Sequence, residues 1–373
     1  MYPFDYPTQT VFYLVLYGAT LVLHVLPMNY VLAGSTYLAL LGVWEAVRGP
    51  AITQRPIVEV LRDWMPFALG ITITAAVAPL LFLQILYQRP FYTANLLLFH
   101  RWMAILPVLI VAFYLLYLQK SKRWHHFAAW IRAVVSVGIL CCFAFVAWSF
   151  TENHLLSTRG QDVWTEVYGS NRWFYFDPEL LPRLTVWYFG AFPVLAAALL
   201  AQFWAAGFTH RNDDAKPDPI TEPTIRTLAV LALGGLVASV LAGSGYFLFL
   251  DEPIRRRLIA TDVWPYLGAA ALGLGVQAAI WFRVRRQASL SGRALACLCL
   301  AVIGAVGAAT ALREARRTST IDLNQYASLH VMASIVGGMG VFLFFLVACT
   351  GALVAVVLAV RRGLIVGNRP PAE

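Results

Sequence analysis

Nine long runs of apolar residues decide what this chain can fold into. A helix needs roughly 20 apolar residues to cross a membrane, because the hydrocarbon layer is about 30 Å thick and a helix rises about 1.5 Å per residue. The runs cover residues 11–44, 65–87, 93–118, 127–150, 184–208, 227–250, 263–282, 294–312 and 323–360. Lipid offers the backbone no hydrogen-bond partners, so each run is expected to be helical. The sequence therefore predicts an all-α, polytopic transmembrane helix bundle.

The composition agrees with this prediction and excludes other classes of protein. Apolar residues make up 60% of the 373 residues, charged residues make up 13%, and the mean hydropathy is +0.68. Soluble domains have about 45–50% apolar and about 25% charged residues. The net charge of +9 does not indicate nucleic acid, because cytoplasmic loops of membrane proteins are rich in Lys and Arg. The lipid bilayer is the expected partner, and no nucleic acid is expected.

The Lys and Arg residues between the runs predict the orientation of the chain. The segments that follow the first, third, fifth, seventh and ninth runs hold 16 of these residues, and the segments on the other side hold 10. Basic segments remain on the cytoplasmic side of a membrane. The N-terminus is therefore expected outside and the C-terminus inside.

The segments between the runs also predict how the chain is organised. We expect one membrane domain over residues 1–373, with a five-span half at 1–208, a polar cytoplasmic linker at 209–226 and a four-span half at 227–373. Residues 151–183 form the longest outer segment and are rich in Trp, Tyr and Phe. These side chains favour the membrane interface. We therefore expect residues 151–183 to form an ordered outer aromatic cap.

Polar residues inside the runs are the first candidates for function, because placing them in hydrocarbon costs free energy. All nineteen Asp and Glu residues fall between the runs or at their ends. A proton-coupled transporter usually needs a carboxylate inside the membrane, so a transporter is the least favoured class. Histidine, amide and arginine side chains remain as candidates.

His100 and His330 are the main candidates for cofactor ligands. Each lies seven residues from the outer end of its run, which corresponds to a depth of about 10 Å. Two neutral imidazoles at one depth on different helices can supply the two axial ligands of a haem b iron. The alternative is that each histidine forms hydrogen bonds within the bundle.

Four arginines lie at or above the depth of these histidines. They are Arg101, Arg313, Arg316 and Arg317. Guanidinium groups bind carboxylates strongly, so these residues could pair with haem propionates. For the three arginines that follow the eighth run, the alternative is contact with lipid phosphates or neighbouring subunits.

Two further groups could contact a cofactor. His24 lies deeper in the first run, where it could replace one axial ligand or contact a quinone head group, or form a hydrogen bond within the bundle. Gln84, Tyr87 and Asn95 lie near the outer turn between the second and third runs. This polar hairpin could line a quinone site, and the alternative is an aromatic belt at the membrane interface.

The three histidines in carboxylate-free runs, with arginines at the outer ends, give the chain a family resemblance. It resembles integral-membrane, b-type-cytochrome-like or quinone-interacting subunits of bacterial respiratory electron-transfer complexes, in the number of runs and the placement of histidines. The resemblance implies a multi-pass protein of the bacterial inner membrane in a respiratory or photosynthetic complex. Such a subunit would pass electrons between quinol and a periplasmic cytochrome c through haem b, alongside other membrane and periplasmic subunits. The alternative is a cofactor-free structural anchor of a multi-protein complex.

Cysteine labelling tests the predicted orientation. We expect a cysteine at Ser157 to react with a membrane-impermeant maleimide added outside, and a cysteine at Ser289 to react only from the cytoplasmic side. The reason is the excess of basic residues on the side that carries Ser289. Labelling of intact cells and of inverted vesicles measures both. Reaction at position 157 from the cytoplasmic side alone would show that the orientation is reversed.

Overall fold

The fold is built from long apolar helices. A computed structural model describes residues 6–49, 55–170, 175–209, 222–287, 291–336 and 340–344, with scattered positions up to 358. Eight helices among these residues are long and apolar enough to cross a membrane, and no strand occurs among them. They are α1 (Thr8–Arg48), α2 (Arg55–Leu86), α4 (Phe99–Lys120), α5 (Ala129–Ser157), α7 (Leu180–Thr209), α8 (Glu222–Phe249), α10 (Trp264–Gln287) and α11 (Gly292–Thr318). The predicted all-α fold with long apolar helices is confirmed for these residues.

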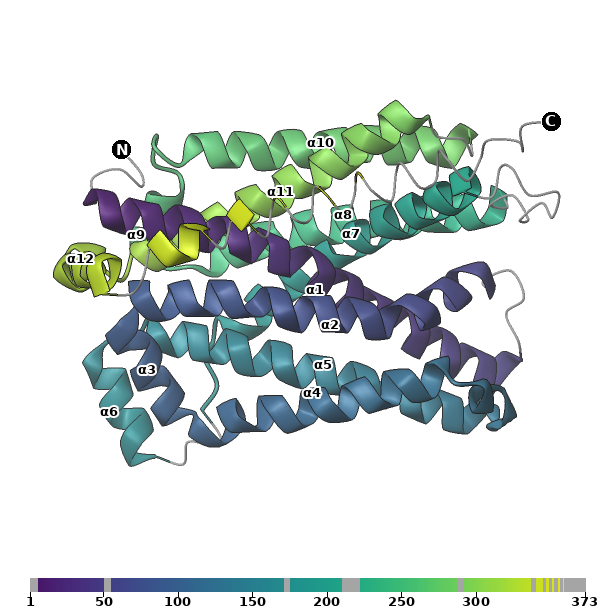
Figure 1. The fold of residues 1–373 in the computed structure, drawn as a ribbon, viewed down its shortest axis with the longest axis horizontal. Helices are drawn as coiled ribbons and strands as arrows, with labels where there is room; N and C mark the ends of the chain where they lie inside the picture. Colours follow the sequence, from purple (N-terminus) through teal and green to yellow (C-terminus); the bar gives the residue numbers. More distant parts are fainter. Residues whose placement is uncertain are drawn as a thin grey trace.

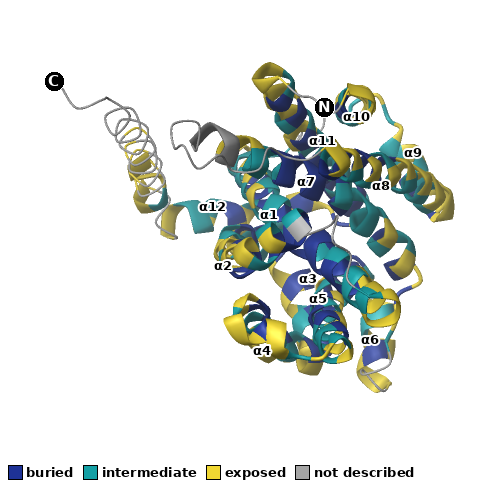
Figure 2. Cartoon of the chain, turned by 90° about the vertical axis from the view of Figure 1, so that its right-hand side faces the viewer, coloured by how far each residue is buried: buried dark blue, intermediate teal, exposed yellow. Residues whose placement is uncertain are grey.

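Helix α1 lies at the centre of the bundle. It packs against α2, α5, α7 and α11, and the long helices run side by side (Figure 1). Its buried side chains Tyr13, Tyr17, Leu21 and Val25 recur every four residues, which places them on one face of a helix. Figure 2 shows buried residues where α1 and α7 lie and exposed residues on the peripheral α4 and α10.

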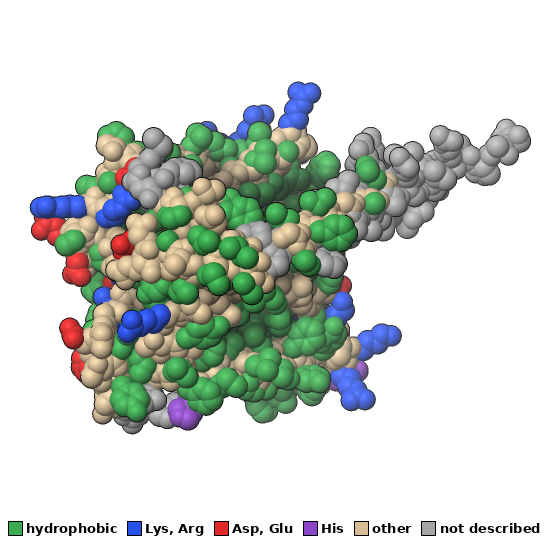
Figure 3. All heavy atoms as spheres, turned by 60° about the vertical axis from the view of Figure 1, so that its left-hand side comes forward, with side chains coloured by type: hydrophobic (Ala, Val, Ile, Leu, Met, Phe, Trp, Pro, Cys, Tyr) green, Lys and Arg blue, Asp and Glu red, His purple; other side chains and the backbone are tan. Residues whose placement is uncertain are grey.

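The outside of the bundle is apolar between its two ends. Large side chains such as Leu23, Tyr114 and Leu241 are exposed along the helices. In Figure 3 most acidic side chains gather at one end, and apolar side chains cover much of the surface between the ends. Extended apolar surface of this kind is typical of contact with a membrane or with other proteins. The described residues are therefore compatible with a lipid bilayer around the bundle.

Short helices gather at the end of the bundle where α1 begins, which we call the cap end (Figure 1). They are α3 (Gln88–Leu97), α6 (Gln161–Gly169), α9 (Glu252–Leu258), η4 (Leu323–Tyr326) and α12 (Ala327–Val336). Val167 of α6 packs with Leu156 at the end of α5 and with Ala94 of α3. This apolar contact holds α6 against the bundle, so the described part of the predicted outer cap packs on the helices. The turn η2 (Lys122–His126) joins α4 to α5.

Two predicted spans differ from the observed helices. The third run was expected to form one helix over 93–118, but the backbone breaks at Leu98 (φ −104°, ψ 26°). The short α3 ends at Leu97 and the spanning α4 starts at Phe99. The ninth run, 323–360, begins in η4 and α12, and most of 337–360 lies outside the described residues.

Several helices continue beyond their apolar runs into polar sequence. Helix α5 continues to Ser157 and α11 continues to Thr318. Ser157 is 1% exposed and accepts a hydrogen bond from Arg317. A cysteine at Ser157 would therefore be a poor target for labelling. Glu166, exposed on α6, replaces it as the position that reports the location of the cap.

A glycine contact sets how closely α7 and α8 approach. A Cβ atom at Gly235 would lie 2.7 Å from Cδ of Pro193 and 3.0 Å from the carbonyl oxygen of Phe189. A Cβ atom at the neighbouring Gly234 would meet nothing within 4 Å. Of these two positions, only Gly235 therefore requires a residue without a side chain. Small residues of this kind allow helix backbones to approach closely in membranes.

We expect Gly235→Ala to lower the melting temperature of the purified protein. The added methyl group forces α7 and α8 apart, and overpacking of this kind costs about 1–3 kcal/mol. Gly234→Ala is the matched control, and it should leave the melting temperature unchanged or raise it, because Ala favours a helix. Thermal unfolding in detergent, followed by tryptophan fluorescence, measures both. Equal melting temperatures for the two variants would contradict the packing described.

Candidate functional site

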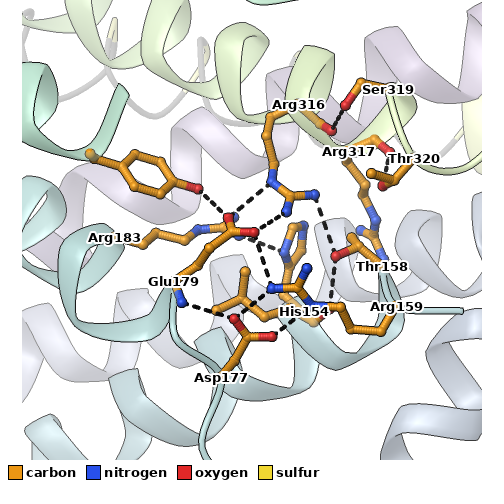
Figure 4. Close-up of polar contacts among 12 residues, drawn as sticks. His154, Thr158, Arg159, Asp177, Glu179, Arg183, Arg316, Arg317, Ser319 and Thr320 are labelled. Carbon is orange, nitrogen blue, oxygen red and sulfur yellow. Dashed lines mark hydrogen bonds and ion pairs between the residues drawn. The ribbon is translucent and has the colours of Figure 1, made fainter. Parts of the chain in front are cut away.

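A buried cluster of arginine and carboxylate side chains lies at the cap end (Figure 4), and Glu179 is at its centre. Arg316 of α11 donates from Nη2 to Glu179 Oε1 at 2.6 Å and from Nε to Oε2 at 3.3 Å. The Tyr246 hydroxyl of α8 donates to Oε2 at 3.0 Å, and Arg159 Nη2 donates to Oε1 at 3.1 Å. Glu179 directly precedes α7. One carboxylate therefore joins α7, α8, α11 and the cap.

Asp177 is the second carboxylate that binds Arg159. Nε and Nη2 of Arg159 donate to Asp177 Oδ2 and Oδ1 at 2.8 and 2.7 Å, and the backbone N–H of Glu179 donates to Oδ1 at 2.9 Å. Burial acts to raise the pKa of Asp177, but these hydrogen bonds outweigh it and hold the pKa below its ordinary value. The hydrogen bond to Asp177 raises the pKa of Arg159. Both groups are therefore ionised at neutral pH.

The cap is also tied to α5 through its backbone. Glu152, near the end of α5, is fully buried and accepts a hydrogen bond at 2.6 Å from the backbone N–H of Asp177. Its second oxygen accepts from Nε1 of Trp148 at 3.1 Å. Arg101 lies over the same Trp148 ring at 4.8 Å and donates to the carbonyl oxygen of Tyr175 at 3.0 Å. These contacts fix residues 175–177 against the start of α4 and the end of α5.

Arg183 has a neutral partner. Its Nη1 donates to Nδ1 of His154 at 2.9 Å, and both side chains are buried. A guanidinium group has no lone pair to accept a hydrogen bond, so His154 accepts with Nδ1 and is the neutral tautomer protonated at Nε2. The charge of Arg183 is therefore not cancelled at this contact.

Arg313 and Arg317 also contact neutral groups. Arg313 Nη1 donates to the Tyr17 hydroxyl at 3.1 Å. Arg317 is fully buried, donates from Nη2 to Ser157 Oγ at 3.0 Å, and lies 3.7 Å from the centre of the Tyr87 ring. In the part of the chain that the structure describes, Arg183, Arg313 and Arg317 form no ion pair with a carboxylate. The carboxylates of the cluster therefore do not pair with all of its arginines.

A pocket of about 660 Å³ opens beside this cluster, between α7, α8, α10 and α11. Its end near the cap, which we call the arginine end, is lined by Arg183, Tyr246, Arg313 and Arg316. Apolar side chains such as Leu236, Val240, Leu274 and Val306 line the pocket further along. The pocket thus joins a cationic end to an apolar body.

Two amide side chains mark the deeper part of the pocket, which we call the amide end. Asn29 of α1 and Gln277 of α10 line it, and each is 2% exposed. Gln277 Nε2 donates to the Ala301 carbonyl at 3.3 Å. Ala301 precedes Arg316 by about four turns of α11, so the two ends lie roughly 20 Å apart. Asn29 Oδ1 is buried and has no hydrogen-bond partner in the described structure.

The predicted histidine ligands have separate surroundings. His330 is fully buried on α12, where Nδ1 lies 2.7 Å from Thr10 Oγ1 and Nε2 lies 3.2 Å from the Leu86 carbonyl oxygen. His100 is exposed, as the second residue of α4. The prediction placed His100 seven residues inside a span. Because the helix breaks at Leu98, His100 instead lies at the start of α4.

Both ring nitrogens of His330 have partners within the chain. An axial ligand must offer a nitrogen lone pair to iron, whereas Thr10 and Leu86 occupy both ring nitrogens of His330. This geometry favours hydrogen bonding within the bundle for His330. His24 does likewise, with Nδ1 3.0 Å from the Thr72 carbonyl oxygen. Haem b ligation by His100 and His330 stays a prediction.

The predicted quinone residues have three different partners. The Tyr92 hydroxyl donates to Gln84 Oε1 at 3.2 Å, and Asn153 Nδ2 donates to Asn95 Oδ1 at 2.6 Å. The Tyr87 hydroxyl donates to the buried Glu314. The hairpin therefore uses these groups in contacts within the chain. Of the predicted site residues, Arg313 and Arg316 line the pocket.

Sequence reasoning missed four buried carboxylates and the histidine that accepts a hydrogen bond from Arg183. They are Glu152, His154, Asp177, Glu179 and Glu314. Each lies just beyond an apolar run or close to its end, where a charged side chain is ordinarily solvated. The available signal was the presence of both charges in the 151–183 segment, next to the arginines that follow the eighth run.

No protein-family model matches this chain, and no curated protein matches it. The functional proposal therefore depends on the geometry of the chain itself.

We expect Asp177→Asn to loosen the cap. The substitution keeps the size of the side chain but removes the charge that Arg159 binds, and a hydrogen bond to a charged group contributes about 1.5–3 kcal/mol. Hydrogen–deuterium exchange should become faster in peptides that cover residues 158–179. Asp162→Asn, on an exposed side chain of α6, removes the same charge and should leave exchange unchanged. Equal exchange in both variants would rule out this role for Asp177.

Proposed function

We propose that the chain is a membrane subunit of a respiratory or photosynthetic electron-transfer complex of a bacterial inner membrane, and that it binds quinone or quinol in the pocket between α7, α8, α10 and α11. The observation that carries the proposal is the pocket itself, which has an apolar body and buried amides at its deeper end. Ligand sites of this kind are mostly apolar, with a few polar groups that orient the ligand.

The amide end matches the chemistry of a quinone ring. The ring is uncharged, its carbonyl oxygens accept hydrogen bonds, and the hydroxyl groups of the reduced form donate them. Asn29 Oδ1 has no partner among the described residues and can accept from a quinol hydroxyl. An amide can serve both forms because it also carries N–H donors. An isoprenoid tail would contact the apolar walls and leave the pocket toward the lipid.

The proposed orientation places the cap end outside, with the N-terminus of α1. The excess of basic residues on the opposite side supports this orientation. The cap would then face periplasmic subunits, including a cytochrome c. Because Thr10 and Leu86 hold both ring nitrogens of His330, we place the redox groups that receive electrons on partner subunits.

A cofactor-free structural anchor is the second candidate. The observation that favours it is that His330 and Arg316 are bound within the chain, by Thr10 and Leu86 and by Glu179 respectively. An anchor needs no ligand in the pocket. Quinol binding therefore separates the two functions.

We expect the purified protein to bind short-chain ubiquinol or menaquinol analogues, and Val240→Trp to weaken that binding at least tenfold. Val240 lines the pocket, so an indole ring at this position fills space that the ligand needs. Leu241→Trp is the matched control on the next residue of α8, which is 68% exposed and does not line the pocket. Isothermal titration in detergent measures the affinities.

Asn29→Leu refines the test because it removes the amide and keeps a similar volume. It should weaken quinol binding about tenfold or less, in line with one lost hydrogen bond of about 0.5–1.5 kcal/mol. Equal affinity for Val240→Trp and wild type would place the quinol elsewhere. Absence of binding to the wild-type protein would overturn the proposal and favour the anchor.

A further inference from the structure

The arginine end of the pocket has a charge that no group of the chain balances. Arg183, Arg313 and Arg316 line it, and no Asp or Glu lies among the described residues of the lining. Glu179 pairs with Arg316. The hydrogen bonds of Arg183 and Arg313 go to His154 and the Tyr17 hydroxyl, which are both neutral. Two guanidinium groups therefore face the pocket without a counter-charge.

The surrounding cluster does not supply the missing charge. The five arginines at positions 159, 183, 313, 316 and 317 exceed by two the carboxylates at positions 177, 179 and 314, even when all three are ionised. Glu152, which lies beside the cluster, has Arg101 as a neighbouring cation, so this pair adds no surplus negative charge. A buried charge without a partner costs several kcal/mol, as an order of magnitude. An anion at the arginine end would remove that cost.

The apolar body indicates that this anion belongs to an amphiphile. Val240, Leu248 and Ile259 line the pocket and are 48%, 69% and 54% exposed, so the pocket is open at these residues. The pocket is therefore continuous with the surface that faces the acyl chains of the bilayer. A free anion would use the arginine end alone and leave this apolar surface uncovered.

We propose that the arginine end binds the phosphate of an anionic phospholipid, with Arg183 and Arg313 as its ligands and the acyl chains against α8 and α10. Arginine is favoured for phosphate because its planar guanidinium donates several hydrogen bonds to phosphate oxygens. Glu179 is a positioning residue, because its ion pair holds Arg316 beside the other two arginines. The phosphate position is distinct from the position proposed for the quinol ring, since the amide end lies roughly 20 Å away along α11.

Native mass spectrometry of the full-length protein with added lipids tests the proposal. We expect phosphatidylglycerol to bind at least ten times more tightly than phosphatidylcholine, and Arg313→Gln to remove most of that preference. Arg313 is the residue to change because it is only half-buried. Arg256→Gln is the matched control, since Arg256 is exposed on α9 and pairs with Glu252. It should keep the wild-type preference.

Three outcomes would overturn the proposal. Equal affinity for the two lipids would show that no anionic head group is selected. Equal losses in Arg313→Gln and Arg256→Gln would show that the preference comes from overall charge. Displacement of phosphatidylglycerol by millimolar inorganic phosphate would show that the site binds a free anion. Quinol titration of Arg313→Gln separates this site from the proposed function, because that affinity should stay at the wild-type value.

Discussion

The cap end depends on one buried ion pair, between Glu179 and Arg316. The Glu179 carboxylate accepts four hydrogen bonds, from Arg159, Arg316 and Tyr246. These donors come from the cap, α11 and α8, so the position of each element is set relative to a residue that immediately precedes α7. Removal of one partner from a buried pair is costly, because the other charge then remains without compensation. The same pair fixes the cationic end of the pocket.

This arrangement explains how charged residues can lie inside a membrane bundle without a carboxylate in the middle of any span. The helices α5 and α11 continue beyond their apolar runs, and their last turns carry Glu152, Glu314 and Arg317 into the interior of the cap end. There the cap supplies Arg159, and Asp177 binds it side-on. The result is a polar layer, closed by the cap, above a pocket whose body is apolar. Within this layer Glu179 is held by four hydrogen bonds, whereas Arg183 and Arg313 line the pocket.

The sequence predicted the spans well because their signal is local. A run of about 20 apolar residues is sufficient to identify α7 or α8. Among the described residues, eight of the nine predicted runs coincide with a helix long and apolar enough to cross a membrane. The sequence did not reveal the break at Leu98, because its neighbours Leu96, Leu97 and Phe99 are apolar like the rest of a span. The short α3 on one side of the break packs against α5 and α6. The predicted depth of His100 was wrong for the same reason, because this break places His100 at the start of α4.

The candidate site was harder to predict, since it depends on contacts between distant residues. Arg316 and Glu179 are 137 positions apart, and nothing in the local sequence of either shows that they meet. Arg313 and Arg316 were identified because they lie at or above the depth predicted for His100 and His330. Glu179, the carboxylate partner of Arg316, was missed because acidic residues near span ends are ordinarily solvated. His330 looked like a ligand in the sequence, whereas its bonds to Thr10 and Leu86 exist only in the folded bundle.

A double-mutant cycle on Glu179→Gln and Arg316→Met tests the role of the ion pair most directly. Thermal or denaturant unfolding of the two single variants and the double variant in detergent gives the coupling between the side chains. We expect each single substitution to destabilise the protein, by about 3–5 kcal/mol where a buried charge is left without its partner. The double variant should lose clearly less than the two losses added together. Additive losses would show that Glu179 and Arg316 act independently, and would contradict the dependence of the cap end on this ion pair.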